Sequence, residues 1–167
     1  LGLFHPTEVE LIEAKGITPL KPKKWIDSST VTISYGYGLS MSPLHLAAAY
    51  ATLINGGYQV IPTILKQDNK DLGRRVISEE TSNQLRKILR SVVQRGTATL
   101  GNVEGYEVGG KTGTANKQKV GARGYDNDRV VSTFVSFFPV KSPRYVLLVS
   151  FDEPSYRGGK EKNERSA

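Results

Sequence analysis

The segment GYEVGGKTGTA, residues 105–115, carries the side chains whose types and spacing could do chemistry in this sequence. Gly105, Gly110, Lys111 and Thr112 fit G-x-x-x-x-G-K-[ST], in which backbone amides and a lysine cradle the phosphates of a nucleotide. The overlapping Lys111-Thr112-Gly113 instead suits a strand, because a glycine inside a strand lets another backbone approach closely. The segment therefore indicates either a phosphate-binding loop or a strand edge where an extended peptide docks.

One further feature favours nucleotide binding, an apolar run at 146–152 that ends in Asp152, where such proteins hold magnesium. The loop itself argues against it. A phosphate loop works because its Lys-Thr pair begins a helix whose N-terminal amides face the anion. Here Lys111 and Thr112 run into a stretch that contains Gly121 and Gly124, so no amphipathic helix can start there. A nucleotide-binding protein stays only as a remote alternative.

Two helices are predicted ahead of this segment. Ser42 and Pro43 open the first, at about 43–55, because serine caps helices and proline suits the first helical position. Its residues are apolar almost all round, which predicts a helix inside a domain. Before it, a short helix is expected over Thr7–Lys15 and irregular chain over Ile17–Thr30, which contains two prolines and a hydroxyl cluster.

The second helix is predicted at about 79–94, with Ser78 as its cap. Apolar residues recur with helical spacing and predict one buried stripe: Leu85, Ile88, Leu89, Val92 and Val93. Arg86, Lys87 and Arg90 lie off that stripe, so we expect them on a solvated face.

Three strands are predicted after the helices, at about 106–114, 130–138 and 144–152. The short link from Pro139 to Pro143 suits a hairpin, which makes the last pair antiparallel. Apolar residues occupy both alternating faces of the last two strands. This sheet therefore needs cover on both sides.

Composition narrows the class of protein. The chain has 167 residues, a formal net charge of +7 and no cysteine, which excludes disulfides and thiolate metal sites. Its densest basic run, Lys21, Lys23 and Lys24, is interpreted as solvated surface rather than a nucleic-acid site. His5 and His45 have no acidic partner spaced to orient them, so neither a metal site nor a catalytic triad is predicted. No cofactor is predicted either. The chain begins with Leu1 rather than Met, and we expect a piece of a longer polypeptide.

Several stretches together resemble one family. Gly109–Ala115, GGKTGTA, resembles the third active-site motif of penicillin-binding protein transpeptidases, whose K-T-G element occurs in penicillin-recognising serine enzymes generally. Residues 35–44, YGYGLSMSPL, resemble the stretch upstream of that motif in class B, division-specific (FtsI-type) members. Residues 51–57, ATLINGG, and 152–154, DEP, continue the match, which covers nearly the whole chain.

The resemblance implies an α+β fold, in which a five-stranded antiparallel sheet lies between helices on both faces. Residues 1–167 would form the C-terminal part of a transpeptidase domain and would supply three of its strands. Two strands, one outer helix and the final helix would lie outside this chain. We therefore expect apolar residues of the strands Val130–Phe138 and Arg144–Asp152 to be exposed, or covered by the rest of the parent or by a second copy.

The resemblance also implies roles for individual residues. The ammonium of Lys111 would lie beside the nucleophilic serine and polarise the network that moves protons. The hydroxyls of Thr112 and Thr114 would bind the carboxylate of a D-Ala-D-Ala stem peptide or of a β-lactam, and the Thr114 amide would supply half of the oxyanion hole. Gly113 would keep the strand edge bare. Tyr37 and Tyr125 resemble aromatic residues that line the cleft in FtsI-type enzymes, with ordinary core or surface tyrosines as the alternative.

The sequence departs from the family pattern in one respect. The family needs a serine with lysine three residues on and a second S-x-N element, and no serine of this chain satisfies either spacing. In the family both motifs precede the segment that begins here, so no nucleophile is predicted in this chain. The chain would be catalytic only together with its missing N-terminal half. A non-catalytic relative that keeps the fold for binding or scaffolding stays open as an alternative.

The parent implied by the resemblance is a serine-type D,D-transpeptidase that cross-links stem peptides during septal wall synthesis and is the target of β-lactams. Its implied partners are an FtsW-type glycosyltransferase and other division proteins. Its implied location is the periplasmic face of the bacterial inner membrane, where a helix absent from this chain would anchor it.

Overall fold

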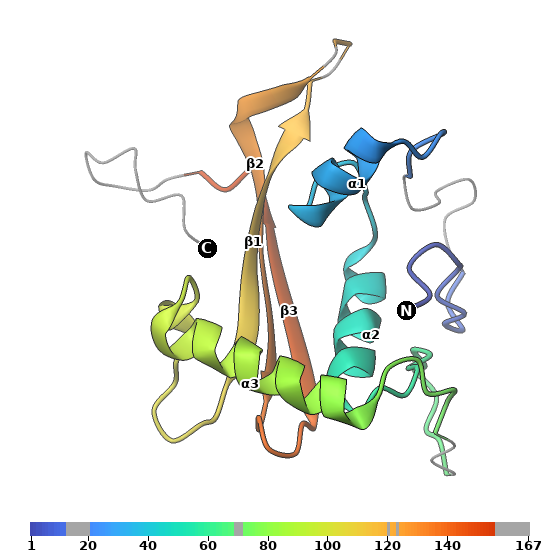
Figure 1. Ribbon diagram of the computed structural model, residues 1–167, viewed down its shortest axis with the longest axis vertical. Helices are drawn as coiled ribbons and strands as arrows, with labels where there is room; N and C mark the ends of the chain where they lie inside the picture. The colour runs from blue at the N-terminus through green and yellow to red at the C-terminus, as the bar shows by residue number, and fades with distance from the viewer. Residues whose placement is uncertain (13–20, 69–71, 120, 123, 156–167) are drawn as a thin grey trace. The chain divides into compact units, whose positions relative to one another are not determined.

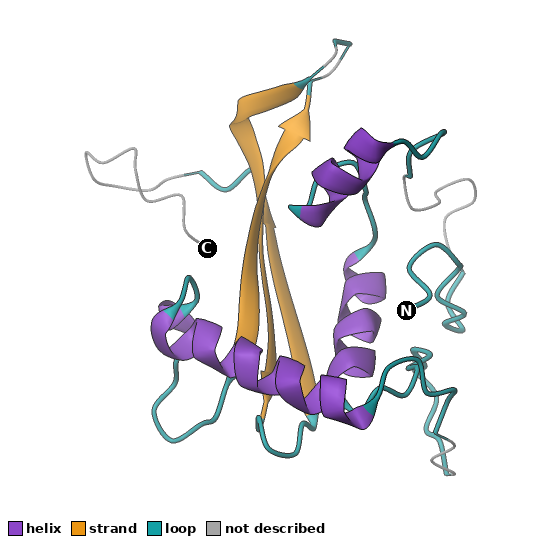
Figure 2. Ribbon diagram, in the orientation of Figure 1, coloured by secondary structure: helices purple, strands orange, loops and turns teal. Residues whose placement is uncertain are grey.

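The computed structural model describes residues 1–12, 21–68, 72–119, 121–122 and 124–155. The chain divides into two compact units, Leu1–Leu85 and Arg86–Ala167, each of which is described by itself. Along the chain the elements are three α-helices, a short 3-10 helix (η1) and three strands (Figures 1 and 2). Among these residues, no helix combines the length and apolar character that crossing a membrane requires.

Helix α2, Pro43–Ile54, lies in the first unit and confirms the predicted helix to within a residue. Ser42 caps it, since its hydroxyl accepts the backbone N–H of His45 at 3.3 Å. Ala49, Thr52 and Ile54 are buried. The buried Thr52 hydroxyl donates to the Ala48 carbonyl at 2.8 Å and accepts the Val60 N–H at 3.0 Å, so its polar group is satisfied.

Helix α1, Asp27–Ser34, was not predicted from the sequence. Its hydroxyl residues bind the backbone of the helix itself: Ser29 Oγ accepts the Ile26 N–H at 3.3 Å, and Thr32 Oγ1 donates to the Ser28 carbonyl at 3.0 Å. Residues 28–30, the hydroxyl cluster predicted to be irregular, therefore lie in a helix that side-chain hydrogen bonds to the backbone support. The short helix expected over Thr7–Lys15 is wrong for residues 7–12, which are not helical, and residues 13–15 lie outside the described chain.

Helix α3, Glu79–Arg95, agrees closely with the predicted helix. In the second unit its C-terminal half packs on the sheet: Val93 is fully buried in a cluster with Ala98 and Val108, against which Phe134 and Phe138 also pack. Ile88 is 59% exposed, contrary to the predicted stripe. At about 100° per residue, Ile88 lies about 140° around the helix from the fully buried Val93, so the buried side is centred nearer to Val93 than to Ile88.

Two arginines of α3 differ from their prediction. Arg86 and Arg90 are partly buried rather than on a fully solvated face, whereas Lys87 is exposed. Arg90 donates to the Val108 carbonyl at 2.7 Å and Arg86 to the Lys141 carbonyl at 2.9 Å. A long arginine side chain can cross an apolar surface and reach such a carbonyl. The spacing of apolar residues along the helix does not predict these contacts. Arg90 thereby connects α3 to the residue just before the first strand.

The strands are β1 (Gly109–Gln118), β2 (Tyr125–Phe138) and β3 (Tyr145–Asp152). They form one antiparallel sheet in the order β1-β2-β3, which confirms the predicted hairpin between the last two. β1 begins later and continues further than predicted, because pairing with β2 reaches Gln118 beyond the K-T-G segment. β2 correspondingly begins at Tyr125 rather than at Val130.

One row of apolar side chains on this sheet is exposed. Residues directly opposite in an antiparallel pair share a face. The face that α3 covers therefore also carries the β3 partners of four alternate β2 residues: Ser132, Phe134, Ser136 and Phe138. These partners are exposed by 38–59%: Tyr145, Leu147, Val149 and Phe151. On the opposite face Val135 and Phe137 are buried. The apolar exposure expected on both strands is therefore present on β3 alone, because the apolar residues of Val130–Phe138 are buried or partly buried. We call the four exposed residues of β3 the β3 row.

Candidate active site

β1 carries the K-T-G-T residues at an edge of the described sheet, where it pairs with β2 alone. Lys111 and Gly113 are opposite Val135 and Thr133, whereas Thr112 and Thr114 are opposite Phe134 and Ser132. The two threonines therefore lie on the α3 face, and the lysine lies on the other. Lys111, Gly113 and Thr114 are exposed and Thr112 is partly buried. The strand thus offers an ammonium, two hydroxyls and an open backbone edge within four residues.

The glycines of β1 differ in how much space a side chain would have at each position. A Cβ on Gly110 would lie 2.6 Å from the Val135 carbonyl oxygen, and one on Gly109 would lie 2.5 Å from the Phe137 ring. Packing within the unit requires these two glycines. A Cβ on Gly113 would meet nothing within 4 Å. No described part of the chain needs a glycine there, so the bare position suits the approach of another molecule.

Two side-chain hydrogen bonds involve the K-T-G-T residues. The Lys111 ammonium donates to the Thr112 carbonyl at 2.6 Å. The Thr112 hydroxyl lies 2.9 Å from the hydroxyl of Thr97, and either can donate. Sequence reasoning missed Thr97, which precedes η1 (Thr99–Gly101) and is 15 residues from its partner. No periodicity or motif spacing signals such a contact.

A hollow of about 270 Å³ lies next to Thr112 on the α3 face. Leu100, Phe134, Val149 and Phe151 contribute to its wall, which contains no charged residue. Leu100 is 86% exposed. An apolar wall of this kind suits cover by apolar side chains better than a charged ligand.

Four charged residues meet at the far end of β1 from Gly109. The Lys117 ammonium binds Asp152 at 2.8 Å and Glu153 at 2.7 Å, and Arg129 binds Glu153 at 2.5 Å. Hydrogen bonds from Arg129, and then from Lys117, lower the pKa of Glu153 to about 2. We call Lys117, Arg129, Asp152 and Glu153 the ion cluster. Nothing in their sequence spacing predicts that these four residues form a charged network.

The two tyrosines named from the sequence lie in different units. Tyr125 is exposed, begins β2 and pairs with Gln118 across the hairpin. Tyr37 lies in the first unit, where its N–H donates to the Thr32 carbonyl at 3.0 Å and its ring centroid is 5.8 Å from that of Tyr35. Tyr125 therefore belongs to the same hairpin as the K-T-G-T residues, whereas the position of Tyr37 is described only within its own unit.

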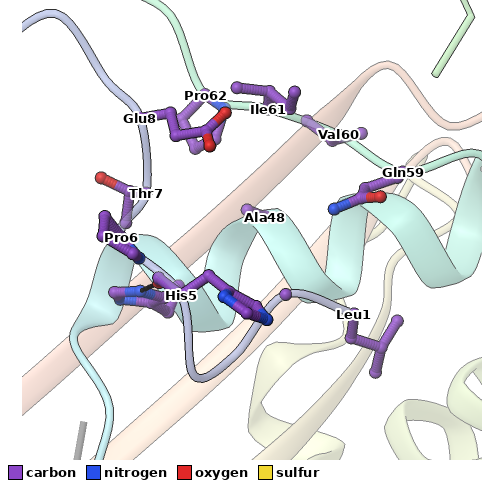
Figure 3. A pocket seen from close by; sticks show the side chains of 12 residues that line it. Leu1, His5, Pro6, Thr7, Glu8, Ala48, Gln59, Val60, Ile61 and Pro62 are labelled. Atoms are coloured by element: carbon purple, nitrogen blue, oxygen red, sulfur yellow. Dashed lines mark hydrogen bonds between the residues drawn. The ribbon is translucent and has the colours of Figure 1, made fainter. Parts of the chain in front are cut away.

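The histidines of the first unit lie at another hollow, of about 150 Å³, which Figure 3 shows from close by. His45 Nε2 lies 2.8 Å from the His5 carbonyl, which can only accept, so this nitrogen carries the proton. Nδ1 therefore accepts from the Ser42 hydroxyl at 2.7 Å. Both ring nitrogens therefore have hydrogen-bond partners, and His45 is partly buried. The described residues contain no group of three or more His, Asp or Glu that could hold a metal ion.

The structure excludes the phosphate-loop interpretation. Gly110, Lys111 and Thr112 lie inside β1, and no helix begins at Lys111. The segment before Gly105 is η1 and a turn rather than a buried strand. The amide cradle and helix dipole that bind phosphate are therefore missing.

Comparisons with known proteins agree with this geometry. The family model described as the penicillin-binding protein transpeptidase domain matches residues 1–167. The chain is 42% identical over 163 residues to a probable peptidoglycan D,D-transpeptidase FtsI of Caulobacter vibrioides, which covers 92% of this chain and 27% of that protein. It is 39% identical over 137 residues to a probable peptidoglycan D,D-transpeptidase PenA of Neisseria gonorrhoeae, covering 81% of this chain and 23% of that protein. The chain thus spans about a quarter of these relatives.

Solved structures give the same result. The transpeptidase domain of penicillin-binding protein 3 from Burkholderia pseudomallei matches with a TM-score of 0.74 and 45% identity over 81% of this chain and 41% of that one. Penicillin-binding protein 3 from Mycobacterium tuberculosis, complexed with aztreonam, matches with a TM-score of 0.80 and 32% identity over 92% of this chain and 38% of that one. With its three-stranded antiparallel sheet, its helices and its K-T-G-T strand, the chain belongs to the penicillin-binding protein transpeptidase family, among the class B relatives of FtsI and PenA.

Proposed function

We propose that residues 1–167 form the C-terminal part of a transpeptidase domain in a serine-type peptidoglycan D,D-transpeptidase. The observation that carries this proposal is the open edge of β1, where an ammonium and two hydroxyls flank a glycine that packing does not require. An extended stem peptide ending in D-Ala-D-Ala can add to such an edge as a strand. A β-lactam carries a comparable carboxylate and would occupy the same place.

The β1 residues would divide the work among them. Lys111 would stabilise developing charge beside the serine nucleophile, and the Thr114 amide would donate to the oxyanion of the tetrahedral intermediate. Thr112 and Thr114 would donate their hydroxyl protons to the substrate carboxylate. Because a hydroxyl has one proton, Thr97 would then have to donate to Thr112 across their 2.9 Å contact. Tyr37 and Tyr125 would line the cleft.

The serine nucleophile would come from residues outside this chain. Its oxygen would attack the carbonyl of the penultimate D-Ala, the terminal D-Ala would leave with a proton, and the acyl-enzyme would remain. An amine of a second stem peptide would then displace the serine and complete the cross-link. No cofactor enters this sequence of steps.

The rest of the domain would also complete the fold. The β3 row leaves apolar surface open on the α3 face, which soluble proteins seldom tolerate over a large area. Segments of the parent outside this chain would cover it. Because relatives carry the names FtsI and PenA, we further propose a role in septal wall synthesis at the periplasmic face of the inner membrane, alongside an FtsW-type glycosyltransferase and other division proteins.

Fluorescent penicillin followed by a denaturing gel tests the proposal. The full-length parent should be labelled, because it would supply the serine that this chain lacks. The isolated 167-residue chain should give no labelled band, since none of its serines has the activating lysine. Labelling of the isolated chain would show that the nucleophile has been misplaced. A folded parent that stays unlabelled would instead favour the alternative, a non-catalytic relative that keeps the fold for binding.

A further inference from the structure

The β1–β2 hairpin contains an irregularity close to the K-T-G-T residues. Pairing is regular from Gly109 to Asn116, which is opposite Val130, and then resumes with Gln118 opposite Tyr125. A single residue of β1, Lys117, is therefore opposed by the four residues 126–129 of β2. Such a bulge leaves backbone groups out of the ladder and bends the strand locally.

The ion cluster closes over this irregularity. Lys117 stands on its β1 side and Arg129 at its β2 end, and both side chains bind the same oxygen of Glu153. Lys117 also binds both oxygens of Asp152, at 2.8 and 3.2 Å. Arg129 uses its Nε as well, at 2.9 Å from Glu153. The two strands are thus joined through a third at the point where their own pairing is interrupted.

Glu153 is itself fixed to the sheet. Its backbone N–H donates to the Val130 carbonyl at 2.9 Å, next to the last regular pair, Val131 with Asp152. Its φ of +49° turns the chain away after β3. Beyond this point β1 and β2 continue as a two-stranded hairpin without β3 beside them (Figure 1). The cluster therefore lies where the three-stranded sheet becomes a free hairpin.

The cluster differs from an ordinary surface ion pair. Isolated exposed pairs contribute little, because solvent screens them and two long side chains must be ordered. Here two cations share one carboxylate, and the Lys117 and Arg129 side chains are only 28% and 35% exposed. The pair of Lys141 with Glu107 gives the contrast, at 3.4 Å with the lysine 86% exposed. Networks with good geometry are the case in which surface charges do hold structure.

We propose that the ion cluster is a clamp that holds the outer end of the β1–β2 hairpin at one angle and so positions Tyr125 for substrate. Tyr125 begins β2 directly before the bulge, whereas Thr114 lies in the regularly paired part of the sheet. Without the clamp, the residues outside the regular register would let the hairpin swing about its bulge, across which Asn116 also donates to Asn127 at 3.3 Å. A misplacement of about 1 Å can lower a catalysed rate by on the order of 100-fold. This role deepens the proposed transpeptidase function and rests on it, with Glu153 as a positioning residue.

The test compares Glu153→Gln with the parent in the full-length protein. Glutamine keeps the size of the side chain and removes its charge. We expect the acylation rate constant for penicillin to fall on the order of tenfold while nearly all molecules still become acylated. Amide hydrogen exchange, measured without ligand, should increase in peptides covering 116–130 and stay unchanged in α3. If the substitution only destabilised the fold, the fraction of molecules that become acylated would fall, and the acylation rate constant of the folded molecules would stay the same.

Two further variants complete the design. Glu107→Gln removes the exposed pair with Lys141 and should match the parent in acylation and in exchange. Arg129→Met leaves Lys117 with both carboxylates and should give a smaller rate loss than Glu153→Gln, which keeps the test open if Glu153→Gln does not fold. Wild-type acylation and exchange in both cluster variants would overturn the clamp. A wild-type parent that is never acylated would overturn the proposed function instead, and exchange would still report on the clamp.

Discussion

At the scale of single residues, Lys111 contributes charge to the surface of β1 and little to packing. It is exposed, and its ammonium donates a hydrogen bond to the carbonyl of its own neighbour, Thr112. Replacing it with alanine in the full-length parent should abolish acylation by penicillin and change the melting temperature by less than about 2 °C. Lys141→Ala, at another exposed lysine, is the matched control and should acylate normally. Near-normal acylation in Lys111→Ala would remove this residue from the mechanism.

Removal of either threonine hydroxyl on the α3 face should weaken β-lactam capture without abolishing it. Thr112→Val and Thr114→Val keep the shape of each side chain and remove one hydrogen-bond donor each. We expect each to weaken capture of a β-lactam carboxylate by roughly 10- to 150-fold, since a hydrogen bond to a charged group contributes about 1.5–3 kcal/mol. Thr133→Val removes a comparable hydroxyl contact, 3.1 Å from Ser150 on the opposite face, and should leave capture unchanged. Acylation at several penicillin concentrations separates binding from rate.

Gly113 permits a sharper test because the fold does not need it. In Gly113→Ala the new methyl group meets no atom of the chain within 4 Å, so the stability of the parent should change by less than about 1 kcal/mol. Acylation should nevertheless fall, because the methyl group occupies the edge where the ligand backbone would lie. In Gly110→Ala the methyl group meets the Val135 carbonyl, and stability should drop by about 1–3 kcal/mol. Equal acylation in Gly113→Ala and the parent would count against docking at this edge.

At the scale of elements, the end of the sheet should be sensitive to acid. Glu153 has its pKa lowered from 4.5 to about 2 by Arg129 and Lys117, so the folded state favours the ionised carboxylate. A lowered pKa stabilises the fold above the unfolded value, and this stability is lost as the pH falls from about 4.5 toward 2. The free energies of urea unfolding of the parent and of Glu153→Gln should therefore differ at pH 7, and the difference should shrink as the pH falls from about 4.5 toward 2. If the difference in unfolding free energy between the two proteins stayed constant from pH 7 to pH 2, Glu153 would not stabilise the fold through its charge.

At the scale of the whole molecule, the β3 row decides how the chain behaves alone. Tyr145, Leu147, Val149 and Phe151 form a continuous apolar row, and the isolated chain should self-associate through it. The double variant Leu147→Thr, Phe151→Thr should reduce this association in sedimentation velocity. In the full-length parent the same variant should lower the melting temperature, because there the row would be covered. A parent indifferent to the double substitution would show that nothing covers this face.

The sequence by itself determined the elements with clear periodicity and the family. The positions of α2, α3 and the last two strands follow from capping residues and from apolar spacing, which are local properties of the chain. The K-T-G-T strand was equally readable, since a short motif lies within one element. The predictions that were wrong concern residues whose contacts within the fold outweighed their local sequence pattern. The hydroxyl cluster around Ser29 formed α1 instead of a loop, and Arg86 and Arg90 reached carbonyls instead of water.

Tertiary structure alone decided which distant residues meet. Thr97 contacts Thr112 across 15 residues, and Lys117 contacts Glu153 across 36. The extension of β1 to Gln118 depends on a strand partner that the segment itself does not encode. Likewise, only the register shows that packing requires Gly110 and leaves Gly113 free. Spacing along a sequence specifies which face of an element a side chain occupies, whereas its neighbours depend on how elements pack, because those contacts join residues whose separation carries no periodic signal.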